Sequence, residues 1–73
     1  MNTNERMRIG VDATALSHKN LTGIGYYLYN VLSVMVKQYS DVEFILYSYE
    51  PIQHHIENSG NVCERIVSRN MIS

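Results

Sequence analysis

The chain has 73 residues, of which 45% are apolar, and its formal net charge is −1. This length suits one small domain, and a nearly neutral charge with scattered Lys and Arg argues against a nucleic-acid-binding surface, which a basic stripe would mark. The single cysteine, Cys63, excludes an internal disulfide, and the spacing of Cys and His matches no zinc site.

The start of the chain is polar. Residues 1–6 lack the apolar core of a signal peptide, so we expect a disordered or loose N-terminus. Elsewhere the apolar runs are far shorter than the about 20 residues of a membrane span. These features together predict a cytoplasmic location.

Residues 7–12 (MRIGVD) predict a short strand, because Ile9 and Val11 share one face. Asp12 ends this strand, where the ligand crevices of α/β sheets lie. It is therefore a candidate cleft residue that orients a substrate hydroxyl. The favoured alternative is that its carboxylate caps the loop that follows. His18 lies in this loop, over residues 13–21, and is a second candidate for the cleft.

Thr22, Gly23, Ile24 and Gly25 form a glycine turn that follows a strand and opens a helix. The free backbone N–H groups at such a helix start bind phosphate, and glycines let a ligand approach the backbone. The spacing lacks the third glycine of a dinucleotide fingerprint. From spacing alone, a phosphate site and a simple packing turn are equally balanced.

Apolar residues spaced by three and four predict a helix over residues 23–38, with Thr22 as its N-cap and Lys37 near its C-terminus. Tyr26 and Tyr29 are expected to be more exposed and are candidates for a partner contact. The face predicted to be buried consists of Ile24, Tyr27, Leu28, Val31, Leu32 and Met35.

Residues 42–49 form the strongest predicted strand, because consecutive apolar and aromatic residues are typical of a strand covered on both faces. Pro51 could open a short helix over 52–57, and residues 62–67 predict a weaker third strand. The adjacent pair His54-His55 invites a metal site, but neighbours on a helix do not share a face, so a metal site is disfavoured.

The order strand, helix, strand predicts an α/β fold, namely a partial Rossmann-like β-α-β unit with a short parallel sheet. Covering both faces of residues 42–49 needs more protein than these elements supply. An exposed sheet edge or apolar face can pair with another copy. We therefore expect the isolated chain to be a homo-oligomer.

Three words of the sequence carry a family resemblance: residues 7–16 (MRIGVDATAL), 22–27 (TGIGYY) and 43–48 (EFILYS). In this order they resemble the N-terminus of the group 1 (family 4) retaining glycosyltransferases. Those enzymes open with M-R-I-G-I-D-A-R-x-L, continue with T-G-I-G-R-Y into a helix and then have E-[FY]-x-L-Y. The chain departs from the family at Thr14, where Arg is frequent, and at Tyr26, where a basic residue is common.

The resemblance implies a two-domain GT-B fold in which residues 7–73 are part of the N-terminal Rossmann-like domain, which mainly handles the acceptor. The C-terminal domain, which binds the nucleotide sugar and carries the glutamate pair, is absent here. Thr22, Gly23, Ile24 and Gly25 would then lie near the donor phosphates or sugar and act through backbone amides. The resemblance points to no catalytic residue, metal or further cofactor within this chain.

The parent would be a hexosyltransferase-type enzyme that transfers a sugar from a nucleotide sugar to an acceptor with retention, in the cytoplasm or at the inner face of the membrane. We expect the fragment alone to be inactive. The alternative is a non-catalytic binding or self-assembly module derived from the same fold. A standalone dinucleotide-binding half is poorer, because Glu50 is the only acidic residue near the end of the second strand.

Overall fold

The structure is a computed structural model that describes residues 6–68. Its elements follow the order strand, short helix, long helix, strand, strand: β1 (Arg8–Asp12), the 3-10 helix η1 (Thr14–Ser17), α1 (Gly23–Gln38), β2 (Glu43–Ser48) and β3 (Val62–Ile66). The loose N-terminus expected over residues 1–6 lies outside the described residues except for Arg6.

The three strands form one parallel sheet in the order β1-β2-β3. In its register Ile9 lies beside Phe44, and Phe44 lies beside Val62. A parallel pair needs a crossover connection, which α1 supplies between β1 and β2. The predicted α/β class is confirmed, and the arrangement is consistent with a partial Rossmann-like unit.

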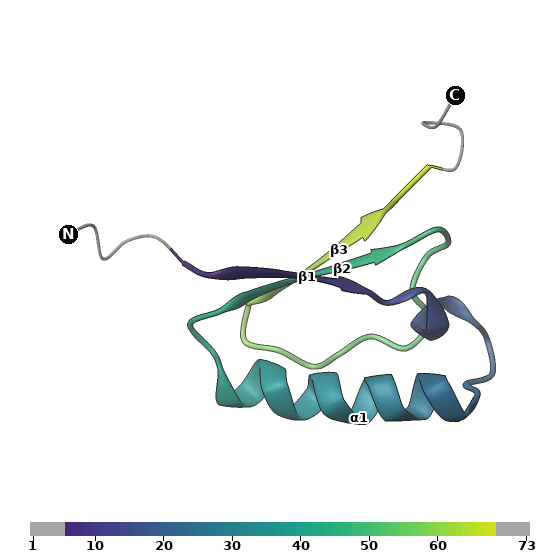
Figure 1. Cartoon of the computed structure of the whole chain (residues 1–73), viewed down its shortest axis with the longest axis horizontal. Coiled ribbons are helices and arrows are strands. Elements are labelled where there is room, and N and C mark those ends of the chain that lie inside the picture. Colours follow the sequence, from purple (N-terminus) through teal and green to yellow (C-terminus); the bar gives the residue numbers. More distant parts are fainter. Residues whose placement is uncertain (1–5, 69–73) are drawn as a thin grey trace.

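One face of the sheet is covered. Figure 1 shows α1 lying along this face, with the connection between β2 and β3 running on the same side. The core between these layers consists of Ala13, Leu16, Leu32, Val36, Val42, Phe44, Leu46, Ile52 and Ile56. Burial of such side chains stabilises the fold by roughly 1.5–3 kcal/mol each.

The opposite face of the sheet is open among residues 6–68. Along β2, Phe44, Leu46 and Ser48 are buried, whereas Ile45 is half-buried and Tyr47 is 41% exposed. The second face of β2 is therefore uncovered in the described part of the chain, in line with the expectation that covering both faces of residues 42–49 needs more protein than these elements supply. Buried and more exposed residues alternate along β2, because successive side chains of a strand point to opposite faces.

Helix α1 begins at Gly23 and ends at Gln38, as the sequence predicts. Thr22 is confirmed as its N-cap, since its Oγ1 accepts a hydrogen bond from the Gly25 N–H at 3.4 Å. Beyond the last turn, the Arg6 guanidinium donates to the carbonyl of Ser40 at 3.1 Å. A cation there suits the negative end of the helix dipole.

The predicted buried face of α1 is partly wrong. Gly25, Leu32 and Val36 are buried, and Tyr29 packs against the core. Ile24 and Tyr27 are instead 75% and 72% exposed. The helix is rotated because Gly25, having no side chain, lets the first turn lie against η1.

The short helix predicted over residues 52–57 is absent, and this segment is irregular. Its backbone is held from outside, because the N–H groups of Gln53 and His54 donate to the Leu16 carbonyl at 2.9 and 3.2 Å. Ile52 and Ile56 are buried in the core. The contacts of this segment with η1 therefore take the place of the short helix that Pro51 was predicted to open over residues 52–57.

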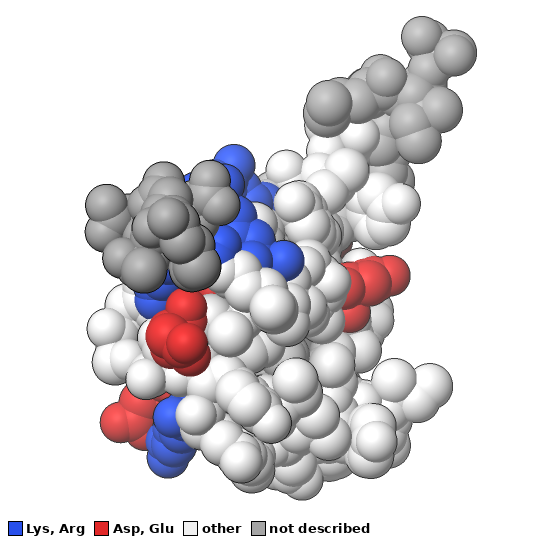
Figure 2. All heavy atoms as spheres, turned by 60° about the vertical axis from the view of Figure 1, so that its left-hand side comes forward, with Lys and Arg blue, Asp and Glu red and all other residues white. Residues whose placement is uncertain are grey.

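Charges are mixed over the face shown in Figure 2, where basic side chains lie beside acidic ones. Arg8 and Glu43, opposite each other on β1 and β2, form an ion pair at 2.9 Å. An exposed pair of this kind contributes at most about 1 kcal/mol. Within residues 6–68, α1 falls short of the length and apolarity that a membrane-spanning helix requires.

Candidate functional site

Chemistry-bearing residues gather where the parallel strands end. The carboxyl ends of all three strands point to one edge of the sheet, and Figure 1 shows η1 and the start of α1 at this same end. Asp12 ends β1 and Ser48 ends β2. This edge is where open α/β sheets bind ligands, so we take it as the candidate site.

A cavity of about 330 Å³ lies at this edge, on the open face of the sheet. Its floor is made by Gly10, against which the Tyr47 ring lies, since a Cβ on Gly10 would be 3.1 Å from Tyr47 Cε2. The walls are mainly apolar, with a few polar groups at the rim, which is the usual make-up of a small-molecule site. The lining residues are Gly10, Val11, Asp12, Thr14, Tyr47, Ser48, Tyr49 and Val67.

Asp12 lines this cavity and also caps the loop. Its Oδ1 accepts hydrogen bonds from the Thr14 hydroxyl at 2.7 Å and from the Thr14 N–H at 3.1 Å. These bonds, the hydroxyl first, lower the pKa of Asp12 because they favour the ionised form. The loop-capping interpretation is thus confirmed, while a role toward a substrate hydroxyl remains a prediction.

The loop that precedes the glycine turn is tied to the β2–β3 connection. His54 Nε2 lies 2.9 Å from the His18 carbonyl and 3.1 Å from that of Lys19. Two carbonyl acceptors require a proton on Nε2, so the ring donates. The His18 side chain is exposed. The loop is therefore positioned through its backbone, and a cleft role for the His18 side chain stays a prediction.

The two glycines of the turn have different surroundings. A Cβ on Gly25 would lie 3.0 Å from Leu21 Cδ2 and 3.3 Å from the Ala15 carbonyl oxygen. A Cβ on Gly23 would meet nothing within 4 Å. Packing therefore explains Gly25, whereas Gly23 is exposed and has open space where a side chain would stand.

The two adjacent histidines have separate partners. His55 Nδ1 lies 2.6 Å from Glu64 Oε2, and His54 Nε2 donates to the carbonyls of His18 and Lys19. In the described part of the chain, no three His, Cys, Asp or Glu side chains gather as metal ligands. The pair instead links the β2–β3 connection to its neighbours.

Sequence reasoning missed Tyr47, Ser48 and Tyr49 as residues of this edge. The sequence pattern places them only within the predicted strand over residues 42–49, although the carboxyl end of a second parallel strand must lie beside that of the first. That topological rule, applied to Asp12, would have found them. His54 carried no comparable signal, because its carbonyl partners are about 35 residues away in sequence.

Neither a family model, nor a curated protein, nor a solved structure matches the chain. The assignment to the α/β class consequently rests on strand order and register alone.

Proposed function

We propose that this chain is the N-terminal unit of a nucleotide-sugar-dependent, retaining glycosyltransferase with a GT-B fold, and that its glycine turn faces the donor phosphates. The observation that carries the proposal is the open space beside the exposed Gly23, at the carboxyl edge of a parallel sheet. The three sequence words that resemble the family lie on β1 with η1, at the start of α1 and on β2, so they meet around this edge.

The chemistry expected of the turn is electrostatic. The first amides of a helix have no intrahelical acceptor, and the positive end of the dipole adds to their attraction for a diphosphate. Thr22 uses its hydroxyl for the Gly25 N–H, which leaves Gly23 and Ile24 as the amides for the ligand. Sugar transfer itself would need the second domain, and the acceptor would bind on the side of Asp12 and the cavity.

A titration of the isotope-labelled chain tests this role. UDP-glucose, GDP-mannose and inorganic pyrophosphate share the diphosphate, and each is added up to millimolar concentration while amide shifts are followed by NMR. We expect shifts at Gly23 and Ile24 and none at Gly60, whose N–H is engaged by Asn58 Oδ1 at 2.8 Å. An absence of shifts with all three ligands would remove the phosphate role.

Gly23→Ala provides the matched variant. Its added methyl group has room in the free protein, so the fold should remain, but the methyl group would stand where the diphosphate approaches. We expect the apparent affinity for the ligand, measured from the shifts at Ile24, to fall by about tenfold. This corresponds to a loss of about 1.4 kcal/mol in binding free energy. Unchanged affinity in this variant would argue that the ligand binds elsewhere.

The alternative, a non-catalytic binding or self-assembly module, is supported by a separate observation. Large apolar side chains are exposed on both α1 and the open face of the sheet, among them Ile24, Tyr27, Val34 and Tyr47. A homo-oligomer would cover such surface. Light scattering after size-exclusion chromatography tests this alternative, and a monomer at all concentrations would count against it.

A further inference from the structure

The side of α1 that points away from the sheet is apolar and exposed. Ile24, Tyr27 and Val34 are 75%, 72% and 61% exposed, and Val31 is half-buried. We call these four residues the α1 stripe. A shallow groove of about 420 Å³ runs along it, lined by Tyr27, Asn30, Val31, Val34 and Met35.

The α1 stripe has the spacing of a coiled-coil seam. Its members are separated by three, four and three residues, which places them at successive a and d positions of a heptad. The residues that α1 turns toward the core lie nearly opposite, at Gly25, Tyr29, Leu32 and Val36. The helix therefore has two apolar faces, and residues 6–68 cover only one of them. A seam of this kind fits another helix.

We propose that the α1 stripe packs antiparallel against the α1 stripe of a second copy of this chain. A two-fold axis near the middle of the stripe places Ile24 beside Val34 of the second copy and Tyr27 beside Val31 of the second copy. Each a position then meets a d position, so the stripe is complementary to itself. Antiparallel helices also bring opposite dipole ends together.

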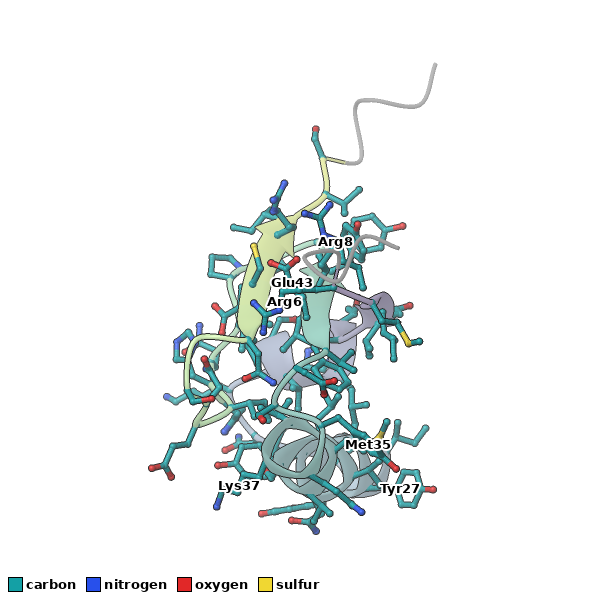
Figure 3. The ribbon with its side chains drawn as sticks, turned by 90° about the vertical axis from the view of Figure 1, so that its left-hand side faces the viewer. Arg6, Arg8, Tyr27, Met35, Lys37 and Glu43 are labelled. Carbon is teal, nitrogen blue, oxygen red and sulfur yellow. The ribbon has the colours of Figure 1, made fainter. Side chains whose placement is uncertain are left out.

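Charge favours a copy of the same chain over a charged partner helix. Lys37 is the one charged residue among the 16 residues of α1. In Figure 3, which looks along the helix, Tyr27 and Met35 project from one flank and Lys37 projects from the other. Two uncharged stripes meet without repulsion, whereas a charged helix would lose its hydration against this surface and gain no ion pair.

The size of the stripe sets the strength of the dimer. A helix of 16 residues is about 24 Å long, and one face of it buries less than the about 800 Å² per partner of a standard interface. We therefore expect a dimer that forms in the micromolar range and dissociates on dilution. This holds whether the glycine turn binds a diphosphate or not, so the two proposals succeed or fail independently.

Sedimentation velocity on the whole chain, from micromolar to millimolar concentration, tests the proposal with two adjacent tyrosines. Tyr27→Glu places a charge within the stripe, and we expect the dissociation constant to rise by about 30-fold or more, the effect of losing a buried aromatic anchor. Tyr26→Glu is the matched control, because Tyr26 is also exposed, at 58%, but lies outside the stripe. Its dissociation constant should stay within about threefold, in the range of a rim residue.

A monomer at all concentrations would overturn the proposal, and so would a dimer that Tyr27→Glu leaves intact. The direction of the helices is tested by disulfide trapping in a Cys63→Ser background. A mixture of Tyr27→Cys and Val31→Cys chains should form mixed disulfides in preference to disulfides between identical chains. A preference for disulfides between identical chains would indicate parallel helices and contradict the proposed arrangement.

Discussion

Gly23 and Gly25 lie two residues apart in the same turn, yet only Gly25 is in close contact with its surroundings. A methyl group on Gly25 would press on the Leu21 side chain at 3.0 Å and on the Ala15 carbonyl oxygen at 3.3 Å. The carbonyl belongs to η1 and cannot move without disturbing the core around Leu16. The turn therefore depends on its second glycine for packing.

We expect Gly25→Ala to lower the free energy of unfolding by about 1–3 kcal/mol, as overpacking does. Gly23→Ala is the control, and it should change stability by less than about 1 kcal/mol, with stabilisation the expected sign. Urea denaturation followed by circular dichroism measures both. Equal losses in the two variants would contradict the difference in packing.

Asp12 is a carboxylate of the candidate site whose pKa is shifted by its hydrogen bonds. Its pKa is lowered by the hydroxyl and then by the N–H of Thr14. Because the folded-state pKa lies below the unfolded one, the interaction stabilises the fold above the unfolded pKa. That contribution disappears as the pH falls through the folded pKa.

Thr14→Val removes the hydroxyl donor and keeps the N–H. We expect the Asp12 pKa to rise part of the way toward its ordinary value, measured by a pH titration of the carboxyl ¹³C shift. Thr14→Ser, which keeps the hydroxyl donor, is the matched control and should leave the Asp12 pKa close to that of the parent chain. An unchanged Asp12 pKa in Thr14→Val would show that the hydroxyl bond is not formed in solution.

At the level of elements, the loop between η1 and α1 depends on His54. His54 lies in the β2–β3 connection, and its ring Nε2 donates to the backbone carbonyls of His18 and Lys19. Each such bond contributes about 0.5–1.5 kcal/mol. The loop leads directly into Thr22, so its position affects the start of α1.

His54→Ala should increase local opening of this loop. We expect hydrogen exchange at Gly25 and Tyr26, whose N–H groups donate to the hydroxyl and the carbonyl of Thr22, to accelerate by about tenfold. This is the effect of losing about 1.4 kcal/mol of local stability. His55→Ala is the matched control, since the neighbouring ring is exposed and contacts Glu64 instead. Acceleration of the same size in both variants would mean that the effect is not local to the His54 bonds.

At the level of the whole molecule, local patterns predicted α1 and the three strands, but they did not predict η1 or the irregular segment over residues 52–57. They also did not predict how the elements face one another. Periodicity and the Thr22 cap gave both ends of α1, because these are properties of the segment itself. The rotation of α1 about its own axis could not be predicted from the sequence pattern, because it depends on the contact between Gly25 and η1. The helix has apolar residues on two sides, and periodicity could not tell which side faces the sheet. For the candidate site, local sequence predicted Asp12 and the glycine turn. It did not predict Tyr47 and His54, because these residues reach the site only through the tertiary fold.

Asn61 joins the start of β3 to the segment between α1 and β2, which lies 19 to 25 residues earlier in the sequence. It is buried, and its Nδ2 donates to the carbonyls of Val36, Tyr39 and Val42 at 3.0, 3.3 and 3.2 Å. It thereby links the end of α1 and the entry to β2 with the start of β3. These carbonyls are the acceptors that a helix end and a turn leave without partners, so the buried amide supplies their hydrogen bonds.

Asn61→Asp keeps the shape of the side chain and replaces the donor with an oxygen. A carboxylate facing three carbonyl oxygens in a buried position is repelled and desolvated, so we expect a loss of about 3 kcal/mol or more in unfolding free energy at neutral pH. Burial and repulsion raise the pKa of the new carboxyl. The loss should therefore shrink as the pH falls and the group binds a proton, which restores one donor. Denaturation curves at neutral and acidic pH, each compared with the parent chain at the same pH, measure the difference. A loss that is the same at both pH values would mean that the carbonyls do not face the side chain, because only an ionised group in this position couples global stability to protonation.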